Sequence, residues 1–204
     1  MPSLVGNLPA SLQSELYKNL NFLNIKEYQG FCDKHNIPCF IHVHTGKGLK
    51  RTAEKDRKNI VLKRIRSYLR TGRMPKCTVF PASAVCADKV KIFTASTRLH
   101  FGQYNKKDVG FLKIMRTLTG DRFADGMIAR VVIRDFWTDG VAPTLKEYAQ
   151  AWLNAMDANT RKHPEYAYLT DLSAGSAGPE WKKLRTAKAE WVLAILNDIP
   201  AQNG

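Results

Sequence analysis

The 204-residue sequence lacks several features that mark whole classes of protein. No apolar run approaches the roughly 18–20 residues that a membrane-spanning helix needs, so no membrane contact is expected. The first residues have no basic segment ahead of an apolar one, which predicts no secretory signal. The 4 cysteines are too few for a disulfide scaffold in a chain of this length. Without a signal they predict reduced thiols in the cytoplasm.

Acidic residues are much less frequent than basic residues in this sequence. The chain has 18 Asp and Glu against 32 Lys and Arg, which gives a net charge of +14. Such an excess points to a polyanionic partner, most often nucleic acid. With 44% hydrophobic residues, the composition is otherwise that of an ordinary globular protein. Composition therefore predicts a class of partner and no chemistry.

The positive charge is concentrated in residues 47–76. This stretch holds twelve basic side chains against only Glu54 and Asp56, a net charge of +10, whereas residues 1–46 are neutral and residues 77–204 carry +4. This density favours a phosphate-binding surface over an ordinary solvated helix face. The candidate nucleic-acid-binding residues are Lys47, Lys50, Arg51, Lys55, Arg57, Lys58, Lys63, Arg64 and Arg66.

Hydrophobic periodicity predicts a mainly α-helical chain. Asn24 and Glu27 have the spacing of a capping box, and Gly72 fits a C-terminal helix cap. A short strand is expected at residues 78–80, and a flexible loop at residues 173–179. The helices are expected over residues 10–20, 25–35, 56–70, 108–118, 125–138, 144–158 and 179–197.

A short β-hairpin is expected between the second and third helices. Residues 39–44 alternate in a β-like pattern and run into a Thr-Gly-Lys-Gly turn signal. We therefore expect a hairpin over residues 39–52 that projects from the surface. Because a two-stranded ribbon fits into a major groove, Lys47, Lys50 and Arg51 are the candidates for contacts with base edges.

Two segments of the N-terminal third resemble the SAP-type (helix–extension–helix) DNA-binding domain. Residues 24–38 (NIKEYQGFCDKHNIP) resemble its first helix and turn, and residues 57–70 (RKNIVLKRIRSYLR) resemble its second helix. The resemblance implies that the basic start of the second helix lies against DNA, with Lys55, Arg57 and Lys58 facing phosphate. It also implies a shared aliphatic and aromatic core made by Ile25, Tyr28, Phe31, Ile37, Val61, Ile65 and Leu69.

The chain departs from the SAP pattern by an insertion of about residues 39–56, where the family has a short glycine-containing extension. We interpret this insertion as the hairpin. The sequence thus predicts a SAP-like nucleic-acid-binding region over residues 1–76 and a helical domain of unknown role over residues 77–204. The helical domain resembles an uncharacterised domain that accompanies SAP-like segments in some bacterial proteins, a likeness that implies no activity. It rests on residues 111–114 (FLKI), 134–137 (RDFW) and 144–152 (TLKEYAQAW).

Five potential zinc ligands lie within thirteen residues, in the order Cys-x2-His-x3-Cys-x2-His-x-His. Zinc takes four nitrogen or sulfur ligands in a tetrahedron, and short turns usually supply them in pairs. This spacing matches no common zinc module, and buried cysteines beside surface histidines explain it as well. The sequence leaves open whether a metal is bound by Cys32, His35, Cys39, His42 and His44.

A metal-dependent nuclease is one alternative, because several carboxylates are spaced four residues apart. Carboxylates next to glycines, however, are typical of helix ends. No P-loop, dinucleotide-binding fingerprint or nucleophile elbow is present, and the sequence predicts no catalytic residue and no cofactor. The residues that such a nuclease would use are Glu54, Lys55, Asp121, Asp125, Asp135 and Asp139.

Aromatic residues of the C-terminal half are candidates for stacking on single-stranded bases. Their helical spacing between polar residues favours a hydrophobic core instead. The aromatic residues concerned are Trp137, Tyr148, Trp152, Tyr166, Tyr168, Trp181 and Trp191.

These patterns predict a cytoplasmic, non-enzymatic protein that binds nucleic acid, with duplex DNA favoured over RNA. It would serve as an accessory subunit whose C-terminal helices contact a protein partner. Three alternatives stay open. The first is an RNA-binding subunit of a ribonucleoprotein, the second is the metal-dependent nuclease, and the third is an adaptor whose basic patch meets an acidic protein.

Overall fold

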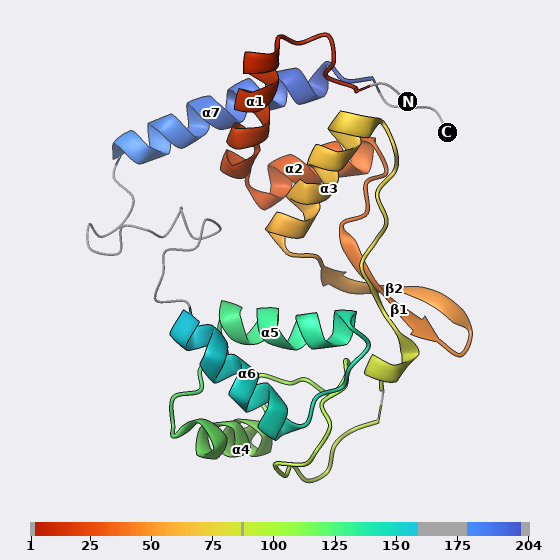
Figure 1. The fold of residues 1–204 in the computed structure, drawn as a ribbon, viewed down its shortest axis with the longest axis vertical. Helices are drawn as coiled ribbons and strands as arrows, with labels where there is room; N and C mark the ends of the chain where they lie inside the picture. The colour runs from red at the N-terminus through yellow and green to blue at the C-terminus, as the bar shows by residue number, and fades with distance from the viewer. Residues whose placement is uncertain (1–2, 87, 159–178, 201–204) are drawn as a thin grey trace. The chain divides into compact units, whose positions relative to one another are not determined.

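A computed structural model describes residues 3–86, 88–158 and 179–200 of the chain. The fold is mainly α-helical with a small three-stranded sheet (Figure 1), as the sequence predicts. Residues 173–178 of the flexible loop expected before the last helix lie outside the described residues, as do Tyr166, Tyr168 and the side chain of Trp181.

The chain forms two compact units, each built from separate stretches of sequence. Unit 1 comprises Met1–Phe40, Glu54–Cys77 and Glu165–Gly204. Unit 2 comprises Ile41–Ala53 and Thr78–Pro164. The chain therefore passes from the first unit to the second and back more than once.

This division differs from the prediction made from the sequence, which placed a single boundary between two regions after residue 76. Most of the hairpin belongs to unit 2, because Ile41 and Val43 are buried in the core of that unit. The C-terminal helix belongs to unit 1, because Val192 and Leu196 are buried in the core there. In both cases an apolar face joins a core that lies far away in sequence.

Unit 1 is helical. It contains α1 (Ala10–Asn19), the 3₁₀ turn η1 (Leu20–Phe22), α2 (Ile25–Lys34), α3 (Lys58–Thr71) and α7 (Pro179–Asn197). Helix α2 contacts α3, and α7 contacts both α1 and α2 (Figure 1). The buried core includes Leu16, Leu20, Leu23, Tyr28, Phe31, Val61, Leu62, Ile65, Tyr68, Leu69, Val192 and Leu196.

Local signals set the ends of these helices. At the start of α2, the Glu27 N–H donates to Asn24 Oδ1 at 3.0 Å and the Asn24 N–H donates to Glu27 Oε2 at 2.6 Å, so the predicted capping box is confirmed. At the end of α3, Gly72 adopts a left-handed φ of 63° and its N–H donates to the Tyr68 carbonyl. Glycine adopts this conformation without the cost that a Cβ imposes.

The sheet contains β1 (Phe40–Thr45), β2 (Gly48–Lys55) and β3 (Val79–Phe80), in the order β2-β1-β3. Strands β1 and β3 are parallel, with His42 opposite Val79. Burial alternates along β1 because successive side chains of a strand point to opposite faces. The expected hairpin is confirmed, with β2 as an outer strand of the sheet.

The helices of unit 2 pack around an aromatic core. They are α4 (Val109–Thr119), α5 (Met127–Thr138) and α6 (Leu145–Ala158), with a 3₁₀ turn at Ala82–Ala84. Helix α6 contacts both α4 and α5 (Figure 1). The core includes Phe80, Phe111, Phe123, Trp137, Tyr148 and Trp152.

Three of the aromatic residues considered for base stacking are thus core residues. Trp137, Tyr148 and Trp152 are buried, and Trp137 Nε1 donates to the Leu99 carbonyl at 2.9 Å. Trp191 packs, partly buried, against the core of unit 1. The core interpretation is confirmed for Trp137, Tyr148 and Trp152, which removes these three as stacking platforms.

Candidate nucleic-acid interface

The nine basic residues predicted to bind nucleic acid are divided between the two units. Lys47, Lys50 and Arg51 belong to unit 2, and we call these three the hairpin surface. The other six belong to unit 1: Lys55, Arg57, Lys58, Lys63, Arg64 and Arg66. A single run of charge in the sequence therefore corresponds to cations on two separately packed units.

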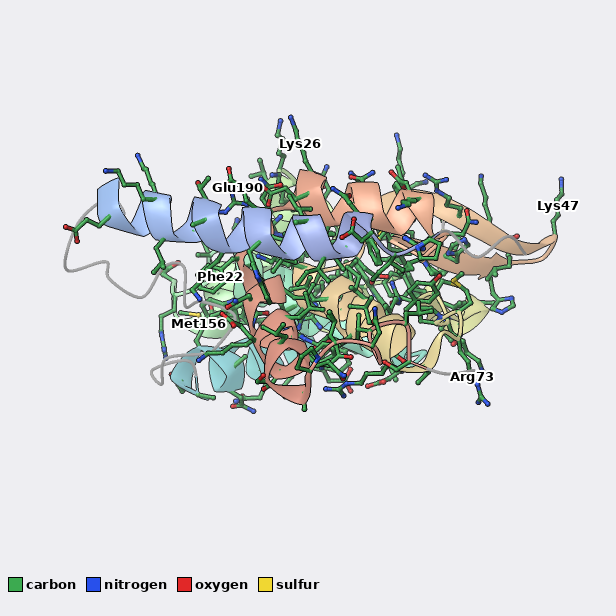
Figure 2. The ribbon with its side chains drawn as sticks, turned by 90° about the horizontal axis from the view of Figure 1, so that it is seen from above. Phe22, Lys26, Lys47, Arg73, Met156 and Glu190 are labelled. Atoms are coloured by element: carbon green, nitrogen blue, oxygen red, sulfur yellow. The ribbon has the colours of Figure 1, made fainter. Side chains whose placement is uncertain are left out.

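The turn of the hairpin holds Lys47 in place. Thr45 Oγ1 accepts a hydrogen bond from the Lys47 N–H at 3.3 Å and donates to the Gly48 carbonyl at 2.9 Å. Gly48 has a φ of +102°, which favours glycine at this position. Figure 2 shows Lys47 at the end of the hairpin with its side chain directed outward. The three cations are exposed, and residues 41–53 contain no acidic side chain.

The rest of unit 2 supports the hairpin through β1. The His42 N–H donates to the Thr78 carbonyl at 2.9 Å, and Thr52 Oγ1 donates to the Ile41 carbonyl at 2.8 Å. Ile41 and Val43 are buried in the core. The hairpin surface therefore lies on the turn and on β2, which is hydrogen-bonded to the anchored strand β1.

Arg64 does not take part in an exposed surface. It is buried, and its Nη1 donates to Asp56 Oδ2 at 2.6 Å and to the Pro38 carbonyl at 2.8 Å. The guanidinium thus fastens α3 to the segment that leads into it and to the turn after α2. This placement removes Arg64 from the phosphate-binding set that the sequence predicts.

Arg66 and Lys58 hold the turn after α1. Arg66 Nη2 donates to Asn21 Oδ1 at 2.9 Å, and its Nε donates to the Tyr17 carbonyl at 3.3 Å. Lys58 Nζ donates to the Asn21 carbonyl at 2.7 Å. Burial, followed by the nearby Arg185 charge, lowers the pKa of Lys58 to about 8. Both side chains are half-buried, so they stabilise the packing of unit 1.

Lys55 and Lys63 are the exposed members of the unit 1 set. Lys55 Nζ donates to Gln29 Oε1 at 2.7 Å and lies 5.8 Å from the centre of the Phe40 ring. Arg57, the N-cap residue of α3, is half-buried. The two lysines keep their ammonium groups at the surface, where contact with phosphate needs no rearrangement of the core.

Three further cations of the basic run over residues 47–76 are exposed but were not among the nine. Arg70 lies on α3 with its guanidinium carbon 4.7 Å from the centre of the Tyr17 ring, and Arg73 and Lys76 follow the Gly72 cap. Figure 2 shows the Arg73 side chain directed outward. They belong to the same basic run, and their positions on the last turn of α3 and beyond its cap could have identified them from the sequence.

The five potential zinc ligands do not form a metal site within the described part of the chain. No group of three or more His, Cys, Asp or Glu side chains there is arranged to hold a metal ion. The hydrogen bond with Cys39, together with burial, raises the pKa of the Cys32 thiol, so it stays protonated. His35 packs against Phe31 and hydrogen-bonds Tyr68 through Nδ1 at 3.3 Å. All four cysteines are free thiols.

The carboxylates considered for a nuclease occupy separate structural positions. Asp121 follows α4 with a φ of 60°, and Asp139 is the C-cap residue of α5. Asp125 accepts a hydrogen bond from the Tyr104 hydroxyl. Burial, followed by the bond to Asp125, raises the pKa of Tyr104. These carboxylates are not part of any three-residue metal-binding group among the described residues.

No protein-family model, no curated protein and no solved structure matches this chain. A search of the described helices finds none with the length and apolar character required to span a bilayer.

Proposed function

We propose that the protein is a non-enzymatic nucleic-acid-binding protein that contacts the phosphate backbone of duplex DNA. The observation that carries this proposal is the hairpin surface. Lys47, Lys50 and Arg51 are exposed on an anchored two-stranded ribbon, in a stretch of thirteen residues without an acidic side chain. A net charge of +14 favours the same class of partner.

The physical basis is counterion release. Each Lys or Arg that neutralises a phosphate frees condensed cations, so the logarithm of the affinity falls with the logarithm of the salt concentration by about 0.9 per contact. Backbone contacts of this kind position a protein without reading sequence. The width of the major groove admits a two-stranded ribbon, which makes the hairpin the part of the chain suited to reach base edges.

The proposal includes a SAP-like role for α2 and α3 in unit 1. The contact between these helices supports it, as does the burial of six of the seven residues that the resemblance places in the core. Ile25 departs from the pattern because 55% of its surface is exposed. On this proposal, Lys55 and Lys63 add phosphate contacts from unit 1.

We further propose that the protein works in the cytoplasm as an accessory subunit, and that the helices of unit 2 contact a protein partner. Four free thiols suit a reducing compartment. An RNA-binding role is the second candidate, because the hairpin surface offers the same phosphate contacts to an RNA duplex. Comparing the affinity for duplex DNA with the affinity for an RNA hairpin distinguishes these two candidate functions.

Fluorescence anisotropy with labelled duplex DNA, single-stranded DNA and an RNA hairpin, measured across a salt series, tests the proposal. A triple variant, Lys47→Gln with Lys50→Gln and Arg51→Gln, should lower the magnitude of the salt slope by about 2.7. The matched control removes three exposed cations elsewhere in unit 2: Lys113, Arg116 and Lys146.

The control triple has the same net charge as the hairpin triple and should change the slope by less than half as much. Equal effects of the two triples would mean that overall charge, and not the hairpin surface, attracts the nucleic acid. Absence of binding to all three probes at low salt would contradict the proposal and favour an acidic protein as partner. Tighter binding to the RNA hairpin than to duplex DNA at equal salt would favour the second candidate.

A further inference from the structure

A large apolar side chain lies within the hairpin surface. Leu49 is the second residue of β2, and 51% of its surface is exposed. Lys47 precedes it by two residues, and Lys50 and Arg51 follow it directly. The hairpin thus presents one aliphatic group in the middle of three cations, which is a different chemical surface from a purely basic loop.

Strand geometry determines how these groups are presented. Successive side chains of a strand alternate between faces, so Leu49 and Arg51 share one face of β2 and Lys50 lies on the other. The Thr45 hydrogen bonds and the positive φ of Gly48 fix the turn immediately before Leu49. Among the described residues, β2 is an outer strand of the sheet, so no strand pairs with its far edge.

An exposed aliphatic side chain between phosphate-binding cations is suited to contact the stacked bases. Proteins that bind the minor groove insert apolar side chains of this size between base steps and kink the duplex, at a cost of a few kcal/mol for unstacking that the additional protein contacts offset. For this mode of binding the ribbon lies in the minor groove, which two-stranded ribbons also enter, and not in the major groove. Arg51 on the same face of β2, and Lys47 in the turn, would contact the phosphate backbone beside such a step.

We propose that Leu49 is an intercalating contact: it inserts between base pairs of the duplex that the hairpin surface holds, and bends that duplex. This inference rests on the proposed function, and it adds that the preferred ligand is duplex DNA with a weakened or flexible base step. A short mismatch or a nick lowers the cost of unstacking, so a protein with an inserting side chain prefers such duplexes.

The experiment compares a 25-base-pair duplex labelled at both ends with the same duplex carrying a central two-base mismatch. Energy transfer between the end labels reports bending, and anisotropy reports affinity. The full chain should bend the intact duplex and bind the mismatched duplex about tenfold more tightly.

Leu49→Ala should abolish most of the bend and most of this preference. The salt slope should stay within about 0.5 of its original value, because the three cations are untouched. Leu49→Met keeps apolar volume and should restore both effects.

Val141→Ala is the matched control, since Val141 is an aliphatic residue of unit 2 with a comparable exposed fraction of 42% and no cation next to it in sequence. It should behave as the unmodified chain does. Unchanged bending and unchanged mismatch preference in Leu49→Ala would overturn the inference. Binding with a normal salt slope but without bending would overturn it and leave the proposed function standing. Absence of any duplex binding would remove both.

Discussion

The ion pair between Arg64 and Asp56 provides the sharpest test of how unit 1 is held together. Only 8% of the Arg64 side chain and 2% of the Asp56 side chain are exposed, and the N–O distance is 2.6 Å. Removing one member of such a pair leaves an uncompensated charge in the interior, which costs about 3–5 kcal/mol. Asp56→Ala should therefore destabilise the protein by roughly this amount.

The double variant Asp56→Ala with Arg64→Met should be less destabilised than Asp56→Ala alone. It leaves no unpaired charge, and methionine fills much of the space of the arginine stem. The assay is urea unfolding followed by circular dichroism for the two single variants, the double variant and the unmodified chain. The coupling free energy of the cycle should exceed about 1.5 kcal/mol.

An exposed ion pair of unit 2 serves as the control. Arg122 and Asp157 are 2.9 Å apart, with 55% and 67% of their side chains exposed. Asp157→Ala should cost less than about 1 kcal/mol, because water screens an exposed pair. If Asp56→Ala costs no more than Asp157→Ala, the reasoning that Arg64 is an interior structural residue is refuted.

Three further predictions concern local features of unit 1, each read as the urea midpoint of unfolding. Asn24→Ala removes the acceptor of the Glu27 N–H and should cost about 1 kcal/mol, whereas Asn24→Ser should retain most of the stability. Gly72→Ala, at a φ of 63°, should cost roughly 1 kcal/mol, and an unchanged midpoint would argue against the left-handed cap. Burial, with a smaller contribution from Lys34, lowers the pKa of His35 below 6.5 in the folded protein. Below pH 6.5 the unfolded chain therefore binds more protons than the folded chain. The free energy of unfolding should decrease as the pH is lowered through this range, by at most about 1.4 kcal/mol per pH unit. His35→Gln should reduce this decrease.

Local signals in the sequence predicted the helices and the hairpin closely. The capping box at Asn24 and the glycine cap at Gly72 depend on neighbouring residues only, so the boundaries of α2 and α3 lie within two residues of those expected. The Thr-Gly-Lys-Gly turn likewise identified the β1–β2 hairpin, because its conformation is determined by a positive φ at Gly48.

The division into two units could not be predicted in the same way. It depends on which core each apolar face joins, and that choice is made by contacts between residues distant in sequence. Ile41 and Val43 belong to the same core as Phe111 and Trp152, although only a few residues separate them from α2. The apolar stripe of α7 packs with Leu16 of α1, at the opposite end of the chain. The local hydrophobic pattern of β1 and of α7 does not indicate which core each apolar face joins.

The basic run illustrates why counting charges overestimates a binding surface. On an amphipathic helix, cations next to the apolar stripe reach carbonyls and carboxylates of the packed elements, as Arg64 and Arg66 do. A long side chain can place its stem along the interior and its charge on an internal partner. Five of the nine predicted cations are exposed: Lys47, Lys50, Arg51, Lys55 and Lys63. If each of these five contacts one phosphate, the salt slope is about −4.5, and not the −8 that nine contacts would give.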